Sequence, residues 1–241
     1  MRACAWFVIA TVVAGCALGE TVRPASAPSR QAPPITIRVV RPDGAGPFPA
    51  VVWLHGCGGV VRGARHLEDW TRRLVRLDYV VAIPDSLSER GYPNGICGNG
   101  TLVPAPRRAE DAYAALRHLE GRPDVIAERI GLIGFSHGGW TVLATMDQDA
   151  GARARAAAGA TRGFTAAIAF YPECAAGSWV SAYRAAAPLL ILIGELDDWT
   201  LARDCRAMIA KRSGIGAPAR LVVVSPALAS PQRTGAVNFI W

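Results

Sequence analysis

The sequence predicts a single α/β domain, built on a mostly parallel sheet with helices on both faces. The chain has 241 residues, of which 51% are hydrophobic, and this is enough chain to bury one substantial core. Short apolar runs rich in β-branched residues alternate along it with segments of helical periodicity. We find no internal repeat and no change of composition that would mark a second domain.

The apolar runs predict the strands. Each run is bounded by Gly, Pro or Asp, and continuous apolar runs are typical of strands that are buried on both faces. The runs are 35–40, 50–54, 79–83, 130–134, 166–170, 189–193 and 221–224. Because strands of this kind occur in parallel sheets that helices cover, we expect most of these strands to be parallel.

The segments between the runs predict the helices. In 65–77 and 107–119, apolar residues recur every three or four positions, which is the spacing of one helix face. Two further helices are expected at 137–146 and 201–211. The stretch 84–106 is rich in Pro, Gly and Asn and is longer than the usual strand-to-helix connection. It follows the carboxyl end of a strand, where open α/β sheets bind ligands, so we interpret it as a functional flap or a mobile segment.

The amino terminus predicts an export signal of the lipoprotein type. A basic start at Met1-Arg2 precedes an apolar run that is too short to span a bilayer. The run ends in Val13-Ala14-Gly15-Cys16, which resembles the bacterial lipobox, where the cysteine is lipidated. The alternative is an ordinary signal in which Cys16 is only a small apolar residue. We expect an exported protein, periplasmic or anchored to the outer membrane through Cys16, with no other membrane contact.

This interpretation divides the chain into three parts. Residues 1–15 are the signal, 16–34 form a flexible tether rich in Pro, Ser and Ala, and 35–241 form the folded domain. The formal net charge is +7, yet the only lysine is Lys211 and the arginines are scattered. Since nucleic-acid-binding proteins cluster their basic residues in a stripe, we do not expect nucleic acid as a partner. The sequence indicates no oligomeric state.

Export also bears on the four cysteines of the domain, which are Cys57, Cys97, Cys174 and Cys205. Structural disulfides persist in an oxidising compartment. Four cysteines allow three pairings, and buried free thiols are the alternative. The chain has no Cys-x-x-Cys or His-Glu-x-x-His motif, so we expect no metal.

The clearest catalytic motif is Gly134-Phe135-Ser136-His137-Gly138-Gly139. It stands directly after a predicted strand and directly before a predicted helix. A nucleophile elbow places a serine on such a turn, with small residues two positions away on either side so that side chains do not block the tight backbone. The motif therefore predicts Ser136 as a nucleophile, against the alternative of a plain glycine-rich turn.

A second glycine-rich motif, His55-Gly56-Cys57-Gly58-Gly59, follows the predicted strand 50–54. Acyl transfer builds negative charge on the carbonyl oxygen of the substrate, and two preorganised backbone N–H groups can stabilise it. We expect one N–H group from His137, the residue after the serine, and the other from the loop at Cys57. The alternative is a simple turn.

These motifs, in this order, resemble the α/β-hydrolase superfamily and, within it, dienelactone-hydrolase-like proteins. The resemblance covers roughly 35–224 and includes three further motifs: Pro84-Asp85-Ser86 with Arg90-Gly91, Phe170-Tyr171-Pro172, and Gly194-Glu195-Leu196-Asp197-Asp198-Trp199. It implies an α/β-hydrolase fold, ester or lactone hydrolysis of a small-molecule substrate through an acyl-serine, and no cofactor. Dienelactone hydrolase itself uses a cysteine nucleophile, whereas this chain has Ser136, so we do not transfer the dienelactone substrate.

The resemblance also implies an acid that orients the catalytic histidine. In the superfamily this acid lies three residues after a glycine that follows a late strand, and Gly194 with Asp197 fits this spacing. Asp198 is the second candidate, and the alternative for either residue is to cap the following helix.

The catalytic histidine itself is missing. The family places it after the last strand, but His55, His66, His118 and His137 all precede Asp197. The segment 225–241 is an atypical tail that lacks both the histidine and the closing helix of the family. We therefore expect a C-terminally truncated fold, through a truncated or frame-shifted gene or an error in the gene model. Among the histidines only His55 lies near the expected cleft, where we expect it to make a structural hydrogen bond.

Two consequences follow for this chain. Activity should be impaired without the histidine, and a catalytically silent binding lipoprotein is the alternative function. The expected positions of the loops also favour one disulfide pairing, in which Cys57 joins Cys97 across the oxyanion loop and the long connection. Cys174, after the strand 166–170, then joins Cys205 in the helix that follows the neighbouring strand.

Overall fold

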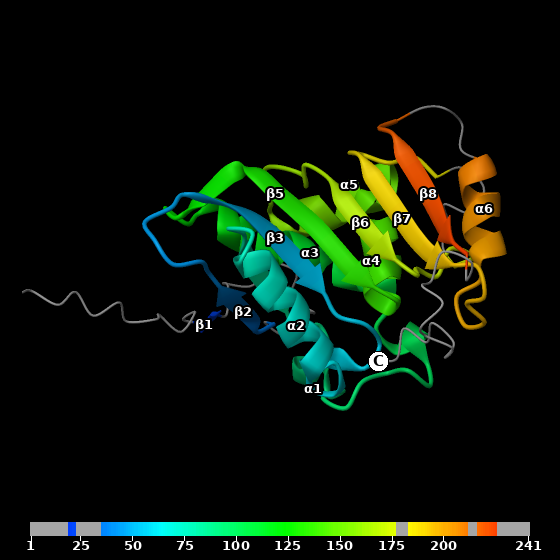
Figure 1. Cartoon of the computed structure of the whole chain (residues 1–241), viewed down its shortest axis with the longest axis horizontal. Coiled ribbons are helices and arrows are strands. Elements are labelled where there is room, and N and C mark those ends of the chain that lie inside the picture. The colour runs from blue at the N-terminus through cyan, green and yellow to red at the C-terminus, as the bar shows by residue number, and fades with distance from the viewer. Residues whose placement is uncertain (1–18, 23–34, 177–182, 212–215, 226–241) are drawn as a thin grey trace, which may run out of the picture.

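One eight-stranded sheet forms the centre of the molecule (Figure 1). The computed structural model describes residues 19–22, 35–176, 183–211 and 216–225. The expected signal, Cys16, most of the expected tether and the tail after residue 225 lie outside these residues. The strands are β1 (Gly19–Val22), β2 (Ile37–Val40), β3 (Phe48–Leu54), β4 (Val80–Pro84), β5 (Val125–Phe135), β6 (Ala167–Phe170), β7 (Leu189–Gly194) and β8 (Ala219–Val224).

The spatial order of the strands is β1-β2-β4-β3-β5-β6-β7-β8. The pairs from β4 to β8 are parallel, while β1 with β2 and β2 with β4 are antiparallel. The predicted sheet is therefore confirmed as mostly parallel. In such a sheet the carboxyl ends of the parallel strands lie at one edge, which brings the loops after β3, β4, β5, β6 and β7 together.

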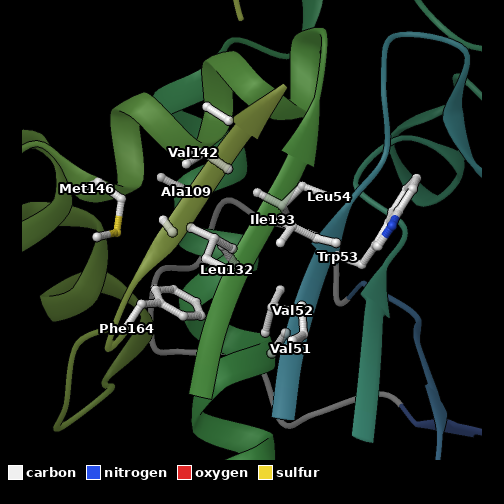
Figure 2. Close-up of a cluster of buried hydrophobic side chains, with 14 of the residues drawn as sticks. Val51, Val52, Trp53, Leu54, Ala109, Leu132, Ile133, Val142, Met146 and Phe164 are labelled. Carbon is white, nitrogen blue, oxygen red and sulfur yellow. The ribbon is translucent and has the colours of Figure 1, made fainter. Parts of the chain in front are cut away.

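Helices cover both faces of the sheet, as predicted. Figure 1 shows α1 (Gly59–Arg62) and α2 (Ala64–Val75) on one face and α3 (Ala105–Glu120), α4 (His137–Met146) and α5 (Gln148–Ala158) on the other. Helix α6 (Ala202–Ala210) packs beside β8. Where α3 and α4 meet the sheet, Val52, Leu54 and Leu132 are almost fully buried in the core (Figure 2).

Two elements differ from the sequence-based expectation. Strand β1 lies in the segment expected to be a tether, and its four residues pair antiparallel with β2. Helix α5 is the second element, because no helix is expected there. Its start is capped by the Asp147 carboxylate, which accepts hydrogen bonds from the Asp149 and Ala150 N–H groups, and Gly159 ends the helix at φ 65°. Its Ala- and Arg-rich sequence has no clear apolar stripe, so its periodicity does not reveal it.

The long connection between β4 and α3 is an ordered flap with its own small core. It contains two short 3₁₀ helices, η1 (Ser88–Arg90) and η2 (Gly100–Leu102). Leu87, Ile96 and Val103 of the flap are buried against Cys57 of the loop after β3. The flap therefore packs onto that loop.

Both predicted disulfides are confirmed. Cys57 bonds to Cys97, with 4.8 Å between their Cα atoms, and ties the loop after β3 to the flap. Cys174 bonds to Cys205, with 5.0 Å between their Cα atoms, and ties the loop after β6 to α6. Both cross-links thus stand at the edge of the sheet where the carboxyl ends of the strands gather.

Candidate active site

Ser136 occupies the turn between β5 and α4 in a backbone conformation that residues other than glycine rarely adopt. Its φ is 54° and its ψ is −117°, which costs free energy unless the surrounding structure enforces it. The Ser136 N–H group donates to the Phe170 carbonyl at 2.9 Å, and the Ser136 carbonyl accepts from the Trp140 N–H group at 2.8 Å. These two hydrogen bonds hold the turn between β6 and the first turn of α4.

Three positions near Ser136 have space for a glycine but not for a residue with a Cβ atom. A Cβ atom on Gly134 would lie 2.3 Å from the Gly138 carbonyl oxygen, and one on Gly138 would lie 2.2 Å from the Leu54 carbonyl oxygen. A Cβ atom on Gly139 would lie 2.7 Å from the Phe170 carbonyl oxygen. Each clash involves backbone, which cannot move aside as a flexible side chain could. The turn thus has the close packing that a nucleophile elbow needs.

The loop after β3 is in direct contact with this turn. A Cβ atom on Gly138 would also lie 2.7 Å from the His55 carbonyl oxygen, so the helix start of α4 lies against the beginning of the loop. The structure therefore brings together the two segments that carry Cys57 and His137, the expected oxyanion donors.

The peptide group between Gly56 and Cys57 is held firmly in one orientation. The Gly56 carbonyl accepts from His55 Nδ1 at 2.8 Å and from the Gly59 N–H group at 3.2 Å. In a trans peptide the N–H group points opposite to the carbonyl, so these bonds also direct the Cys57 N–H group away from the His55 ring. The Cys57 carbonyl accepts from the Ile96 N–H group of the flap at 2.8 Å.

His55 makes the structural hydrogen bonds that we expected of it. Its ring is almost fully buried, and Nε2 accepts a hydrogen bond from the Ser86 N–H group at 3.2 Å. Because Nε2 accepts, the proton of the neutral ring is on Nδ1, which donates to the Gly56 carbonyl. Burial, assisted by the nearby charge of Arg108, lowers the pKa of His55 to about 3.

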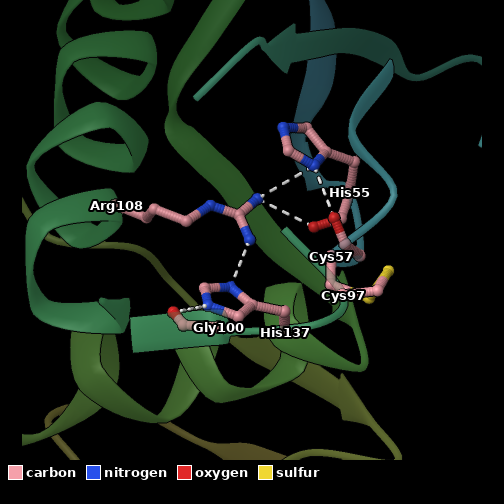
Figure 3. Close-up of a disulfide and its surroundings, with 7 residues drawn as sticks. His55, Cys57, Cys97, Gly100, Arg108 and His137 are labelled. Atoms are coloured by element: carbon pink, nitrogen blue, oxygen red, sulfur yellow. Dashed lines mark hydrogen bonds between the residues drawn. A yellow bond between two sulfur atoms is a disulfide. The ribbon is translucent and has the colours of Figure 1, made fainter. Parts of the chain in front are cut away.

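His137 is engaged in the same way at both ring nitrogens. Nδ1 lies 2.7 Å from Nη1 of Arg108, and Nε2 lies 2.9 Å from the Gly100 carbonyl of the flap (Figure 3). Since the guanidinium can only donate, Nδ1 accepts and Nε2 carries the proton. Burial and then the charge of Arg108 lower the pKa of His137 to about 3. The ring is therefore neutral, and it is occupied by contacts with α3 and the flap.

The other two histidines lie in different surroundings. The His66 ring packs edge-on against Phe135, with 4.6 Å between ring centroids, and also contacts Trp53 and Trp70. Burial lowers the pKa of His66 and that of His118, which lies near the end of α3. Within the described residues no hydrogen bond joins either ring to Ser136.

Asp197 stands in the loop after β7, at the same edge of the sheet as Ser136 but two strands away. The register places Phe135 beside Phe170 and Phe170 beside Leu192, so β6 separates the two loops. The Asp197 carboxylate accepts from the Trp199 and Thr200 N–H groups at 3.1 and 2.8 Å, which closes a turn before α6.

Tyr171 lies at the end of β6, between the serine and acid loops. Its φ is 36°, and its pKa is raised by burial and then by the charge of Asp197. Asp197 is partly buried, whereas Asp198 is exposed. Of the two candidate acids, Asp197 is therefore the less exposed, and its charge acts on Tyr171.

Arg108 is the part of the site that the sequence does not reveal. It lies on the buried face of α3 and is completely buried. Its guanidinium contacts both His55 and His137 (Figure 3). The sequence carries one signal that could have found it. Arg108 stands three residues after Ala105 and four before Ala112, on the apolar stripe of that helix, and a charged residue is unusual in such a stripe.

The described residues contain no candidate metal site and no candidate membrane-spanning helix. In this part of the chain, no group of three His, Cys, Asp or Glu side chains is arranged to hold a metal ion. Of the helices described, none has both the length and the apolar character needed to cross a bilayer.

The comparison with known families agrees with this geometry. Residues 35–228 match the model of the dienelactone hydrolase family. The chain belongs to the dienelactone hydrolase family. The match covers the whole described domain from β2 to β8, including both glycine-rich loops.

An individual curated relative matches a smaller part of this dienelactone hydrolase family member than the family model does. A candidate carboxymethylenebutenolidase of Synechocystis sp. is 32% identical over 114 residues, which are 43% of this chain and 45% of that protein. The match thus spans less than half the length of this curated relative.

Solved structures share the α/β-hydrolase fold. A candidate dienelactone hydrolase from Klebsiella pneumoniae has a TM-score of 0.63 at 22% identity, over 87% of this chain and 85% of that one. Thermogutta terrifontis esterase 2 has a TM-score of 0.60 at 15% identity, over 86% of this chain and 83% of that one. At these identities the likeness establishes the fold of this family member and nothing finer.

Proposed function

We propose that this chain is a serine hydrolase of carboxylic ester or lactone bonds in small molecules, which acts through an acyl-serine intermediate. The observation that carries the proposal is the Ser136 turn, with φ of 54° and three glycines packed against backbone. Membership of the dienelactone hydrolase family supports the same reaction class. The esterase and the candidate dienelactone hydrolase among the similar structures are compatible with it.

In the proposed reaction, Ser136 Oγ attacks the carbonyl carbon of the ester and becomes acylated, and the alcohol leaves with a proton. Water then attacks the acyl-serine and releases the acid. The N–H groups of Cys57 and His137 stabilise the negative charge on the carbonyl oxygen in both steps. Support comes from the contact between their two loops and from the bonds that fix the Gly56–Cys57 peptide.

A complete triad would add a base that takes the serine proton and an acid that orients the base. We propose Asp197 as the acid, because it is partly buried and its charge acts on Tyr171 beside the serine loop. The base is not found among the histidines of this sequence. His55 and His137 use both ring nitrogens elsewhere, and no histidine follows His137 in the 241 residues.

The chain as written should therefore hydrolyse esters slowly. In the serine protease subtilisin, loss of the triad histidine alone lowers kcat by a factor of about 2 × 10⁶. Stabilisation of the oxyanion and binding of the substrate then leave an acceleration of about 10³ to 10⁴ over water in that enzyme. The alternative function, a catalytically silent binding protein, is favoured by one observation, namely this missing base.

The experiment compares the chain as written with a version extended by a histidine loop and closing helix of the family type. Both are assayed with a nitrophenyl ester, each beside its Ser136→Ala variant. We expect weak hydrolysis that depends on Ser136 in the first protein and a gain of several orders of magnitude in the second. If neither protein shows hydrolysis that depends on Ser136, the hydrolase proposal is wrong and the binding alternative replaces it.

A further inference from the structure

Arg108 is completely buried, although it carries a charge. It lies on α3 among Ala105, Ala109 and Ala112, which are also completely buried. A buried guanidinium costs free energy unless hydrogen bonds replace its hydration. The partners that Arg108 has in place of water therefore indicate what the residue does.

Those partners are the two loops of the proposed oxyanion hole. Nη1 donates to Nδ1 of His137 at 2.7 Å, and Nη2 donates to the carbonyl oxygen of His55 at 2.8 Å (Figure 3). His137 supplies one of the proposed oxyanion N–H groups itself. His55 stands two residues before Cys57, which supplies the other. One guanidinium thus joins the segments that carry both donors.

The nearest carboxylate on the same face of the helix as Arg108 has another partner. Asp111, three residues on, forms a two-pronged ion pair with Arg90 of the flap, in which both N–O distances are 2.8 Å. Among the residues that the structure describes, Arg108 itself forms no ion pair. Its hydrogen bonds therefore serve the two loops and do not neutralise its charge.

We infer that Arg108 is a positioning residue for the oxyanion hole, fixing the separation of the Cys57 and His137 amides by holding the His55 carbonyl and the His137 ring at once. The inference rests on the proposed function and deepens it. The planar guanidinium suits this task, because its N–H groups diverge at fixed angles and bind two acceptors simultaneously. A lysine would present one point charge on a flexible stem.

The charge and the geometry of Arg108 can be separated by substitution. Burial lowers the pKa of Arg108 to about 10, so the side chain stays charged at neutral pH. Arg108→Lys keeps a cation but loses the two-pronged link, whereas Arg108→Met loses both. His137→Leu cuts the same link from its other end and leaves Arg108 in place. Arg122→Lys is the matched control, since Arg122 pairs with Asp124 beyond the end of α3.

The experiment measures the rate constant for modification of Ser136 by a fluorophosphonate, with the modified peptide quantified by mass spectrometry. Attack on phosphorus also builds charge on an oxygen that the oxyanion donors bind, so the rate reports their placement. All variants are compared at a temperature where circular dichroism shows them folded. We expect a fall of about 10-fold to 100-fold for Arg108→Lys, Arg108→Met and His137→Leu, and no change for Arg122→Lys.

A purely structural role would lower the melting temperature of the Arg108 variants but leave the rate of the folded protein unchanged. If Ser136 in Arg108→Lys is modified at the parent rate, the inference is overturned and the proposed function is left standing. If the Arg108 variants do not fold, modification of His137→Leu at the parent rate would overturn the inference in the same way. Absence of Ser136 modification in the parent protein would overturn the proposed function, and the inference with it.

Discussion

At the scale of single residues, the strained turn at Ser136 depends on glycines whose surroundings leave no space for a Cβ atom. Gly138 is the clearest case, because a Cβ atom there would lie 2.2 Å from the Leu54 carbonyl oxygen and 2.7 Å from that of His55. The same contact holds the two proposed oxyanion loops together. Stability and the shape of the site are thus linked at this residue.

We expect Gly138→Ala to lower the free energy of unfolding by about 1–3 kcal/mol or more, because backbone must move to admit the methyl group. Gly98→Ala is the control, since a Cβ atom there would meet nothing within 4 Å. It should change stability by less than about 0.5 kcal/mol. Urea denaturation of both variants measures the difference, and equal stabilities would contradict the close contact.

The lowered pKa values of His55 and His137 predict that the protein loses stability in mild acid. Both have a pKa of about 3 in the folded protein, against an ordinary value of 6.5. Between these values the unfolded chain binds protons that the folded protein excludes, so stability is fully present above pH 6.5 and falls as the pH falls. Each histidine contributes about 1.4 kcal/mol per pH unit in that window.

Urea denaturation at pH 7 and pH 5 should therefore give a free energy of unfolding that is lower at pH 5 by about 2 kcal/mol for each of these histidines. His137→Gln should remove about 2 kcal/mol of this dependence. His66 and His118, whose pKa values burial also lowers, add to the part that remains. Most carboxylates titrate below this window, so they add little to the difference. A stability that does not change between the two pH values would contradict the neutral, buried state of these rings.

At the scale of elements, the flap between β4 and α3 contacts both proposed oxyanion residues. It bonds to Cys57 through the disulfide and through the Ile96 N–H group, and its Gly100 carbonyl binds the His137 ring. The flap therefore restrains the same two segments that Arg108 contacts. The other disulfide, Cys174–Cys205, ties the loop after β6 to α6 and includes neither of the proposed oxyanion residues.

The two disulfides give a matched comparison. They close loops of similar length, with sequence separations of 40 and 31, so removal of either by paired Cys→Ala substitution should cost about 4 kcal/mol. Only the pair at Cys57 and Cys97 should also slow the modification of Ser136 in folded protein. Equal effects of both pairs on that rate would contradict the role of the flap.

The elements show which features a sequence can reveal. Strands β2 to β7 are predictable because burial leaves a continuous apolar run, and β8 is predictable from its apolar run although the strand is at most partly buried. Helix α4 is predicted with its observed bounds because the Ser136 motif marks its start. Strand β1 escapes prediction because pairing with β2, a tertiary effect, holds four residues in an otherwise unpatterned segment. Arg108 escapes it because a charged residue on a helix usually faces water, and only the packed structure gives it two acceptors.

At the scale of the whole molecule, two disulfides are consistent with an exported protein, because such bonds persist in oxidising compartments. We propose that a lipid on Cys16 anchors the domain to the membrane surface, in the periplasm or at the outer membrane. Labelling of cells with a radioactive fatty acid should mark the parent protein and not Cys16→Ala. Equal labelling of the two would exclude the lipobox.

The proposal of an acyl-serine makes one more demand on this 241-residue chain, whose histidines offer no base. Both halves of the reaction need a base, so water should attack the acyl-serine as slowly as the serine attacks the ester. Incubation with a nitrophenyl acetate, followed by intact and peptide mass spectrometry, should reveal one acetyl group that accumulates on Ser136 and is absent from Ser136→Ala. Acetylation at other residues with Ser136 unmodified, or rapid turnover in which no acyl-serine accumulates, would contradict this account.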